Sequence, residues 1–307
     1  MTTVAASDRS AWPTRDDERI DSLDVLRGFA LLGILVMNIQ SFSMTAGEYV
    51  RPHAYFALEG ANLVVWLVGY VLFDLKFMAM FSIMFGAGLV LMSRRGEASG
   101  RTVIGIHYRR MVLLLVFGLV HAYAIWYGDI LVPYAVCGMV VFWMRNWPVR
   151  RLLIVGAGLI TLGAAFHGLT GLAAVYSPAT VESLREELRP SEEALANDIA
   201  AYRGSWTDQM PLRFRQAAEL QFFLLPSMLF WRLSGLMLIG MALFKSGFLS
   251  AALSRRTYVA TAIVSGIAGV PIVGLGAFWD YANGFPPEQV VGFGALPNWF
   301  GSVGVAF

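Results

Sequence analysis

Long apolar runs recur along the whole 307-residue chain and constrain its fold more than any other feature. A bilayer core of about 30 Å needs about 20 apolar residues for each spanning helix, and several runs reach that length. Charged residues make up only 14% of the chain, against about 25% in ordinary soluble domains. Because a helix satisfies its backbone polar groups internally, it is the form such runs take in lipid. The sequence therefore predicts an all-α, polytopic transmembrane helix bundle.

The runs predict about seven full spans and a truncated eighth. The expected spans are 22–43, 74–93, 108–127, 129–145, 150–173, 217–245 and 257–279, with a last run from about 292. We divide the chain into a polar N-terminal segment, 1–20, and a helix bundle, 21–307, that is expected to be incomplete at its C-terminus. Residues 174–216 are expected to form a helical loop outside the membrane.

Arginine placement predicts the orientation of the bundle. The segments 93–110, 145–151 and 245–256 are rich in basic residues and are expected in the cytoplasm, together with the N-terminus. The loop 174–216 carries seven acidic and five basic residues and is expected on the opposite side. For the spans to alternate correctly, residues 60–72 are expected to lie along the outer interface.

Three polar residues interrupt the first apolar run, SLDVLRGFALLGILVMNIQSF. Asp24 and Arg27 are one helical turn apart and are expected to pair. Arg27 and Asn38 are eleven residues apart, which places them about 20° from the same helix face and about 16 Å apart along the axis. An ionised group at the centre of a spanning helix costs about 2.5–3.5 kcal/mol on insertion scales. We therefore expect this polar stripe to face protein or water.

The third span repeats the arrangement. Arg109 and Arg110 open it at the expected cytoplasmic end, and His121 lies eleven residues beyond Arg110. Asp129 follows after a short turn, close enough in sequence to contact His121 and fix its tautomer. The alternative, in which His121 only bonds a backbone carbonyl, stays open on spacing alone.

Arg232 lies in the middle of the sixth span, LFWRLSGLMLIGMALFKSGF. An arginine at that depth needs a carboxylate, carbonyl groups or water around it. The carboxylates suggested by the sequence are Asp24, Glu219 and Asp129. A structural ion pair and a site for an anionic ligand are both compatible with this position.

Other features narrow the range of functions. The single cysteine, Cys137, excludes an internal disulfide and a cysteine-based metal cluster, and no metal site is expected. A net charge of +2 gives no reason to expect nucleic acid as a partner. His53 is expected to be solvated in the first outer connection. Gly86 and Gly88 mark a place where another backbone, or a ligand, comes close.

Four stretches in order carry a family resemblance: SLDVLRGFALLGILVMNIQSF, KFMAMFSIMFGAG, RRMVLLLVFGLVHAYAIWYGDILVPYAVCG and LSGLMLIGMALFKSGF. Together they resemble the YeiB-like family of bacterial inner-membrane proteins, which contain the domain of unknown function 418. The resemblance implies a multi-pass protein of the bacterial inner membrane. Members of this family continue for several more spans, so the chain is expected to lack C-terminal helices.

The first span also resembles a group of enzymes. Its LDxxRG signature, at Leu23, Asp24, Arg27 and Gly28, is similar to that of heparan-α-glucosaminide N-acetyltransferase and related transmembrane acyltransferases. Those proteins bind acyl-CoA from the cytoplasmic side and acylate a sugar-type acceptor on the far side. The resemblance extends to Asn38 and, more loosely, to the arginines that open the third span.

Two functional hypotheses follow, and the residues leave open whether the protein is an enzyme. In the first, Asp24 and the arginines of the first and third spans bind acyl-CoA as a co-substrate, and no cofactor stays bound. His121, oriented by Asp129, then acts as general base on a small-molecule or glycan acceptor, and Asn38 stabilises the oxyanion. In the second, the same residues line the pathway of a transporter or export permease with Arg232 as its binding group. A non-enzymatic membrane protein is a third alternative, and the oligomeric state is not predicted.

Overall fold

The computed structural model describes residues 21–43, 52, 57–100, 102–188 and 191–306, and within these ranges it contains helices and no strand. Its long apolar helices are Asp21–Phe42, Gly60–Ala98, Val103–Ile125, Val149–Tyr176, Met210–Lys245 and Arg255–Ala282, with a shorter one at Leu131–Met144. Each overlaps one of the seven predicted full spans; six are long and apolar enough to cross a membrane, and Leu131–Met144 is shorter. The predicted all-α bundle of membrane-spanning helices is therefore confirmed. The N-terminal segment 1–20 and His53 lie outside the described residues.

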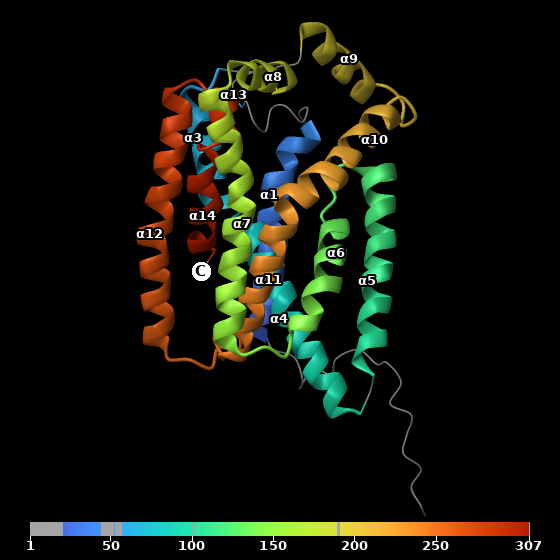
Figure 1. Ribbon diagram of the computed structural model, residues 1–307, viewed down its shortest axis with the longest axis vertical. Helices are drawn as coiled ribbons and strands as arrows, with labels where there is room; N and C mark the ends of the chain where they lie inside the picture. Colours follow the sequence, from blue (N-terminus) through green and yellow to red (C-terminus); the bar gives the residue numbers. More distant parts are fainter. Residues whose placement is uncertain (1–20, 44–51, 53–56, 101, 189–190, 307) are drawn as a thin grey trace, which may run out of the picture.

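The helices run up and down along the long axis of the molecule (Figure 1). In chain order they are α1 (Asp21–Ser43), α4 (Lys76–Ala98), α5 (Val103–Val120), α6 (Leu131–Val141) with η4 (Phe142–Met144), α7 (Val149–Tyr176), α11 (Phe230–Lys245), α12 (Arg255–Ala282) and α14 (Ala295–Val305). The connections α4–α5, α6–α7 and α11–α12 lie at one end. The arginine-rich segments therefore share one end of the bundle, as predicted, and which side of a membrane it faces remains a prediction.

The opposite end carries the 174–216 region (Figure 1). It forms α8 (Pro178–Leu188) and α9 (Glu192–Arg203), and α10 (Met210–Glu219) leads back into the bundle through the π-helical segment η5 (Leu220–Leu229). Ser191 caps α9, because its side chain accepts a hydrogen bond from the Ala194 N–H at 3.2 Å. The helical character predicted for this loop is present.

Helix α11 forms the centre of the bundle, where it packs against α4, α6 and α7. Its closest contacts use glycine, which lets backbones approach. Gly86 of α4 faces the Met237 carbonyl of α11, and Gly156 of α7 faces the Gly235 carbonyl of α11. The close approach predicted at Gly86 is therefore a helix–helix backbone contact.

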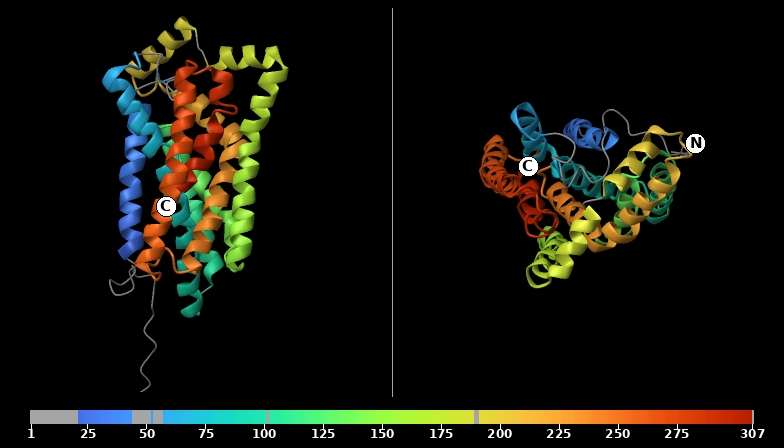
Figure 2. Two further views of the ribbon diagram at one scale, coloured as in Figure 1. Left: turned by 90° about the vertical axis from the view of Figure 1, so that its left-hand side faces the viewer. Right: turned by 90° about the horizontal axis from the view of Figure 1, so that it is seen from above.

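The segment before α4 differs from its prediction. It forms α3 (Gly60–Val68) and the π-helical η2 (Gly69–Phe73), and the chain then breaks at Leu75, whose φ is 60°. Figure 2 shows this segment descending steeply beside α1, where an interfacial helix would lie flat. An interfacial helix needs a strongly polar face. The α3 sequence, GANLVVWLV, has no such polar face, so this helix can lie in apolar surroundings.

Candidate functional site

His121 and Asp129 form the hydrogen-bonded pair that their spacing allowed, in place of the alternative in which His121 bonds only a backbone carbonyl. Nδ1 of His121 lies 3.0 Å from Oδ1 of Asp129. The other carboxylate oxygen accepts the Val132 N–H at 2.8 Å, so the buried Asp129 side chain is fixed at the first turn of α6. In the described part of the chain, no cluster of three His, Cys, Asp or Glu residues that could hold a metal ion occurs. Because Asp129 is buried and held by the Val132 N–H, its hydrogen bond can orient the His121 imidazole for proton transfer.

A π-helical segment, η3 (His121–Ile125), carries this histidine. Short π-helical segments occur frequently at functional sites. The Ala124 carbonyl of η3 accepts hydrogen bonds from Trp206 Nε1 at 2.8 Å and from Arg213 Nη1 at 3.1 Å. Trp206 lies between α9 and α10 and Arg213 lies in α10, 82 and 89 residues away from Ala124 in sequence. The sequence offered no signal for this contact, which holds the histidine-bearing segment against the loop end of the bundle.

The His121 side chain remains accessible. It is 33% exposed, whereas the Asp129 side chain is fully buried. Trp126 stands near the imidazole, with 6.1 Å between ring centroids, and Phe42 of α1 packs edge-on against Trp126 at 4.9 Å. The end of α1 therefore borders the pair. A bound molecule could reach the imidazole from this side, next to aromatic surfaces.

The arginines of α1 and α5 meet at the other end, over one face of α4. Arg27 pairs with Asp24 at 3.5 Å, as predicted. Its Nη2 lies 2.9 Å from the position that a Cβ on Gly88 would take, and Nη1 of Arg110 lies 3.2 Å from the Met92 sulfur. Because Gly88 and Met92 are one helical turn apart on α4, both guanidinium groups lie over the same surface. The structure thus brings together arginines from two helices that the sequence could only place separately.

The remaining predicted residues of this site are less closely tied to it. Arg109 is exposed beside Arg110, and Asn38 is half-buried on α1. Among the described residues, Asn38 makes no hydrogen bond to His121 or Asp129. Its suggested contact with an oxyanion therefore stays a prediction.

Arg232 lies elsewhere and has different partners. It is fully buried, and it donates from Nη1 to the Trp299 carbonyl and from Nη2 to the Ser302 hydroxyl, both at 2.6 Å. Its guanidinium also lies 4.5 Å from the centre of a Trp299 ring. The sequence suggested three carboxylates as partners: Asp24, Asp129 and Glu219. Instead its hydrogen-bond partners belong to α14, because that short helix enters the bundle beside α11.

A second polar cluster, which sequence reasoning missed, lies where the segment preceding α4 is broken. Lys76 donates from Nζ to the Asn298 side-chain oxygen at 2.6 Å and to the Tyr70 carbonyl at 2.7 Å. Asn298 donates in turn to Asp74 at 2.5 Å, and the side chains of all three are buried. We call Asp74, Lys76 and Asn298 the buried network. Its only signal in the sequence is an acid and a lysine, two residues apart, inside a long apolar stretch.

The fold and these two clusters define the class: a membrane-type helical protein with polar groups held inside and along its bundle. The chain is 30% identical over 266 residues to the "Uncharacterized protein YeiB" of Escherichia coli (strain K12), an alignment that covers 83% of the chain and 63% of YeiB. It is 35% identical over 164 residues to the "Uncharacterized protein YxaH" of Bacillus subtilis (strain 168), which covers 50% of the chain and 39% of YxaH. The chain is thus related to the YeiB-type proteins, as its motif stretches predicted.

A third relative is an "Uncharacterized 39.9 kDa protein in amylase 3'region" of Bacillus acidopullulyticus, 34% identical over 127 residues, or 41% of the chain and 34% of that protein. The chain therefore spans less than two thirds of the length of each of these relatives. No family model and no solved structure matches it. The likeness to domain of unknown function 418 and to acyltransferases consequently remains a prediction.

Proposed function

We propose that the protein transfers an acyl group from acyl-CoA to a hydroxyl or amine acceptor on the other side of the membrane. The observation that carries this proposal is the His121–Asp129 pair, because an accessible imidazole oriented by a buried carboxylate suits general-base catalysis. The pair lies at the opposite end of α5 from Arg110, about 16 Å away along the helix. Donor and acceptor can therefore approach from different ends.

The arginines provide the donor end of this site. Arg27 of α1 and Arg110 of α5 lie over one face of α4, and Arg109 is exposed beside Arg110. These three arginines suit the phosphate groups of CoA. Guanidinium groups bind phosphate oxygens through paired, charge-assisted hydrogen bonds. Asp24 holds Arg27 in place from the preceding turn. The phosphates would thus stay at the arginine end while the thioester extends towards His121.

Transfer then needs one proton acceptor. In the proposed tautomer Nδ1–H of His121 donates a hydrogen bond to Asp129, 3.0 Å away, and the Nε2 lone pair takes the acceptor's proton. The acceptor oxygen or nitrogen bonds to the thioester carbon, and the carbon–sulfur bond breaks. The departing CoA sulfur receives the proton from the imidazole, so the histidine is returned to its starting state. Asn38 is proposed to stabilise the negative charge on the carbonyl oxygen.

A direct test uses the purified protein, labelled acetyl-CoA and a panel of sugar and amine acceptors, with labelled product as the readout. His121→Ala should lower kcat by about 10²–10⁴-fold, the usual contribution of a general base. The matched control is Tyr123→Phe, which removes the Tyr123–Gln221 hydrogen bond of 3.2 Å on the same π-helical segment and spares the imidazole. Equal turnover in wild type and His121→Ala would refute the mechanism.

The donor site is tested separately. Arg110→Gln should raise the KM for acyl-CoA about tenfold, as expected for one lost charge-assisted contact, and leave kcat nearly unchanged. Arg256→Gln is the control, because Arg256 is also an exposed arginine in the basic segment 245–256. An equal rise in KM for both variants would mean that only general surface charge attracts the donor.

Transport is the second candidate, and the buried network favours it. Transporters commonly bind solutes beside broken helices inside the bundle, and Asp74 and Lys76 flank the break at Leu75. Flux of small anions or amines into proteoliposomes without any acyl donor would support this reading, and Asp74→Asn should abolish that flux. Absence of flux together with acyl transfer would exclude it.

A further inference from the structure

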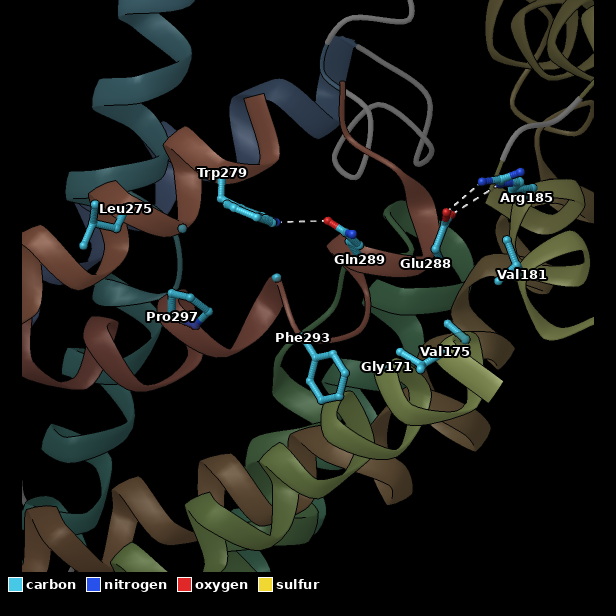
Figure 3. A pocket seen from close by; sticks show the side chains of 13 residues that line it. Gly171, Val175, Val181, Arg185, Leu275, Trp279, Glu288, Gln289, Phe293 and Pro297 are labelled. Atoms are coloured by element: carbon cyan, nitrogen blue, oxygen red, sulfur yellow. Dashed lines mark hydrogen bonds and ion pairs between the residues drawn. The ribbon is translucent and has the colours of Figure 1, made fainter. Parts of the chain in front are cut away.

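A cavity of about 700 Å³ lies at the loop end of the bundle, between α7, α8, α12, α14 and the short helix α13 (Pro287–Val290) (Figure 3). Its size lies within the range of about 300–1,000 Å³ that is usual for ligand sites. Figure 1 places α12 and α5 on opposite sides of the bundle, so the cavity is separate from the His121–Asp129 pair. The proposed acyl transfer does not use it.

The walls of the cavity are mostly apolar. Val175 of α7 and Leu275 of α12 lie on opposite sides of it, and Phe293 and Pro297 line it between them. Phe293 packs against Gly171 of α7, which leaves no side chain of its own in the space. The cavity therefore suits a hydrocarbon chain.

Charged groups stand at one edge. Nη2 of Arg185 lies 2.8 Å from Oε1 of Glu288, and Nε lies 3.4 Å from Oε2, so the two form a fork-shaped ion pair. Trp279 donates to the Gln289 side-chain oxygen at 3.0 Å across the cavity (Figure 3). An acid, a base and an amide thus lie together above an apolar space.

The cavity opens on the outer surface of the bundle. Leu275 and Val175 are 69% and 67% exposed, although both line it. Trp279 is more than half exposed at the same level, and tryptophan is typical of the membrane interface. A molecule could therefore enter sideways from lipid, with its polar part at the level of Arg185 and Glu288.

We propose that this cavity binds one phospholipid whose head group carries a primary ammonium, as in phosphatidylethanolamine. The phosphate of the lipid would contact Arg185, which has five N–H donors and uses two on Glu288. The ammonium would contact the Glu288 carboxylate, and one acyl chain would lie between Val175 and Leu275. An anionic head group would meet Glu288 unfavourably, and a quaternary ammonium has no N–H to donate.

The test measures binding of phosphatidylethanolamine, phosphatidylcholine and phosphatidylglycerol with identical acyl chains to the purified, delipidated protein by native mass spectrometry. We expect phosphatidylethanolamine to bind about fivefold more tightly than the other two, as one added charge-assisted hydrogen bond implies. Glu288→Gln should remove its preference over phosphatidylcholine. Leu275→Trp, which fills the cavity, should lower the affinity for all three.

Two controls match these variants. Ile267→Trp adds the same side chain at another exposed position of α12, and Asp198→Asn neutralises the carboxylate of a different ion pair, with Arg215 at 3.6 Å. Neither should change lipid binding. Equal affinity of the wild type for all three lipids, or unchanged binding in Leu275→Trp, would overturn the proposal. If Leu275→Trp does not fold, the preference measured in Glu288→Gln decides the question.

Discussion

The two faces of α4 differ in how they handle polar groups. One face packs on α11, with Gly86 against a backbone carbonyl, and α4 begins there with Lys76 inside the buried network. The other face meets α1 and α5, where Gly88 and Met92 lie under the guanidinium groups of Arg27 and Arg110. On the first face Lys76 and Gly86 are buried. On the second face the charged groups are partly exposed.

This difference distinguishes residues that stabilise the fold from residues that are available to bind a ligand. A buried charge is stabilised only by its partners, and its removal leaves those partners unpaired in an apolar interior. A partly exposed arginine is solvated, so it can exchange water for a ligand at small cost. We therefore expect the buried network mainly to hold α14 against α4, and the α1–α5 face to be the place of the proposed ligand binding. The predictions below test this division.

The largest effect is expected from Asp74→Ala. The substitution removes a carboxylate that accepts from Asn298 and leaves Lys76 without its buried counter-charge. Loss of one partner from a buried charged group costs about 3–5 kcal/mol. The free energy of unfolding in detergent, from denaturant titration, measures it.

The paired variant is His121→Ala on the other side of the bundle. His121 is partly exposed, and without it the buried Asp129 carboxylate keeps, among the described residues, only its hydrogen bond from the Val132 N–H. Its loss should therefore cost about 1–3 kcal/mol, less than Asp74→Ala. If Asp74→Ala proves as stable as wild type and only abolishes solute flux, the division is wrong and the buried network is the functional site.

A smaller effect is expected from two glycines on α4. Gly86→Ala would place a methyl group against the Met237 carbonyl and force α4 away from α11. Overpacking of this kind costs about 1–3 kcal/mol, more than the 1 kcal/mol or less by which alanine exceeds glycine in helix propensity. Thermal unfolding should show a clear loss, and Gly158→Ala on α7, which meets no neighbouring atom within 4 Å, should show none.

Gly88→Ala, only two residues from Gly86, tests the other face of α4. The added methyl group would meet the Arg27 guanidinium, the flexible end of a long side chain, which can move aside. Stability should therefore stay the same or rise slightly through helix propensity, while the KM for acyl-CoA rises because Arg27 is displaced. A stability loss equal to that of Gly86→Ala would show that both faces are equally rigid.

Much of the fold and of the proposed acyl-transfer site follows from local sequence patterns. The spans follow from apolar length, the Asp24–Arg27 pair from one helical turn, and the His121–Asp129 contact from a turn of a few residues. The partners in both pairs are near in sequence, so the local backbone, a helical turn in one case and a short connection in the other, limits their distance. The arrangement of Arg27 and Arg110 over α4 is different, because it depends on how three helices pack.

The buried network could not be derived in this way. Lys76 and Asn298 are 222 residues apart, and their contact requires both the break at Leu75 and the entry of α14 beside α11. A strained αL residue such as Leu75 is rarely signalled by its type, since leucine has no preference for positive φ. Arg232 was located correctly within a span, but its partners on α14 depend on the same packing.

The smallest predicted effect concerns the contact between the loop and the histidine-bearing segment. The Ser205 N–H and hydroxyl donate to Asp208 at 2.8 and 2.7 Å, and these hydrogen bonds lower the pKa of Asp208. A lowered pKa means that the ionised carboxylate stabilises this turn above its usual pKa of about 3.9, and that the stabilisation is lost as the pH falls through the lower folded value. Trp206, inside the turn, is the residue that donates to the Ala124 carbonyl.

Hydrogen exchange of the amides of residues 204–210 measures this effect, with wild type and Asp208→Asn compared at the same pH. At about pH 7 the variant should exchange several times faster, because an amide oxygen accepts more weakly than a carboxylate. The difference should shrink as the pH falls through the lowered folded pKa of Asp208, where the wild-type carboxylate becomes protonated as well. Asp198→Asn should leave these amides unchanged. A difference that persists unaltered at low pH would mean that the Asp208 charge does not hold the turn, and that Trp206 and Arg213 alone fix the loop on the segment carrying His121.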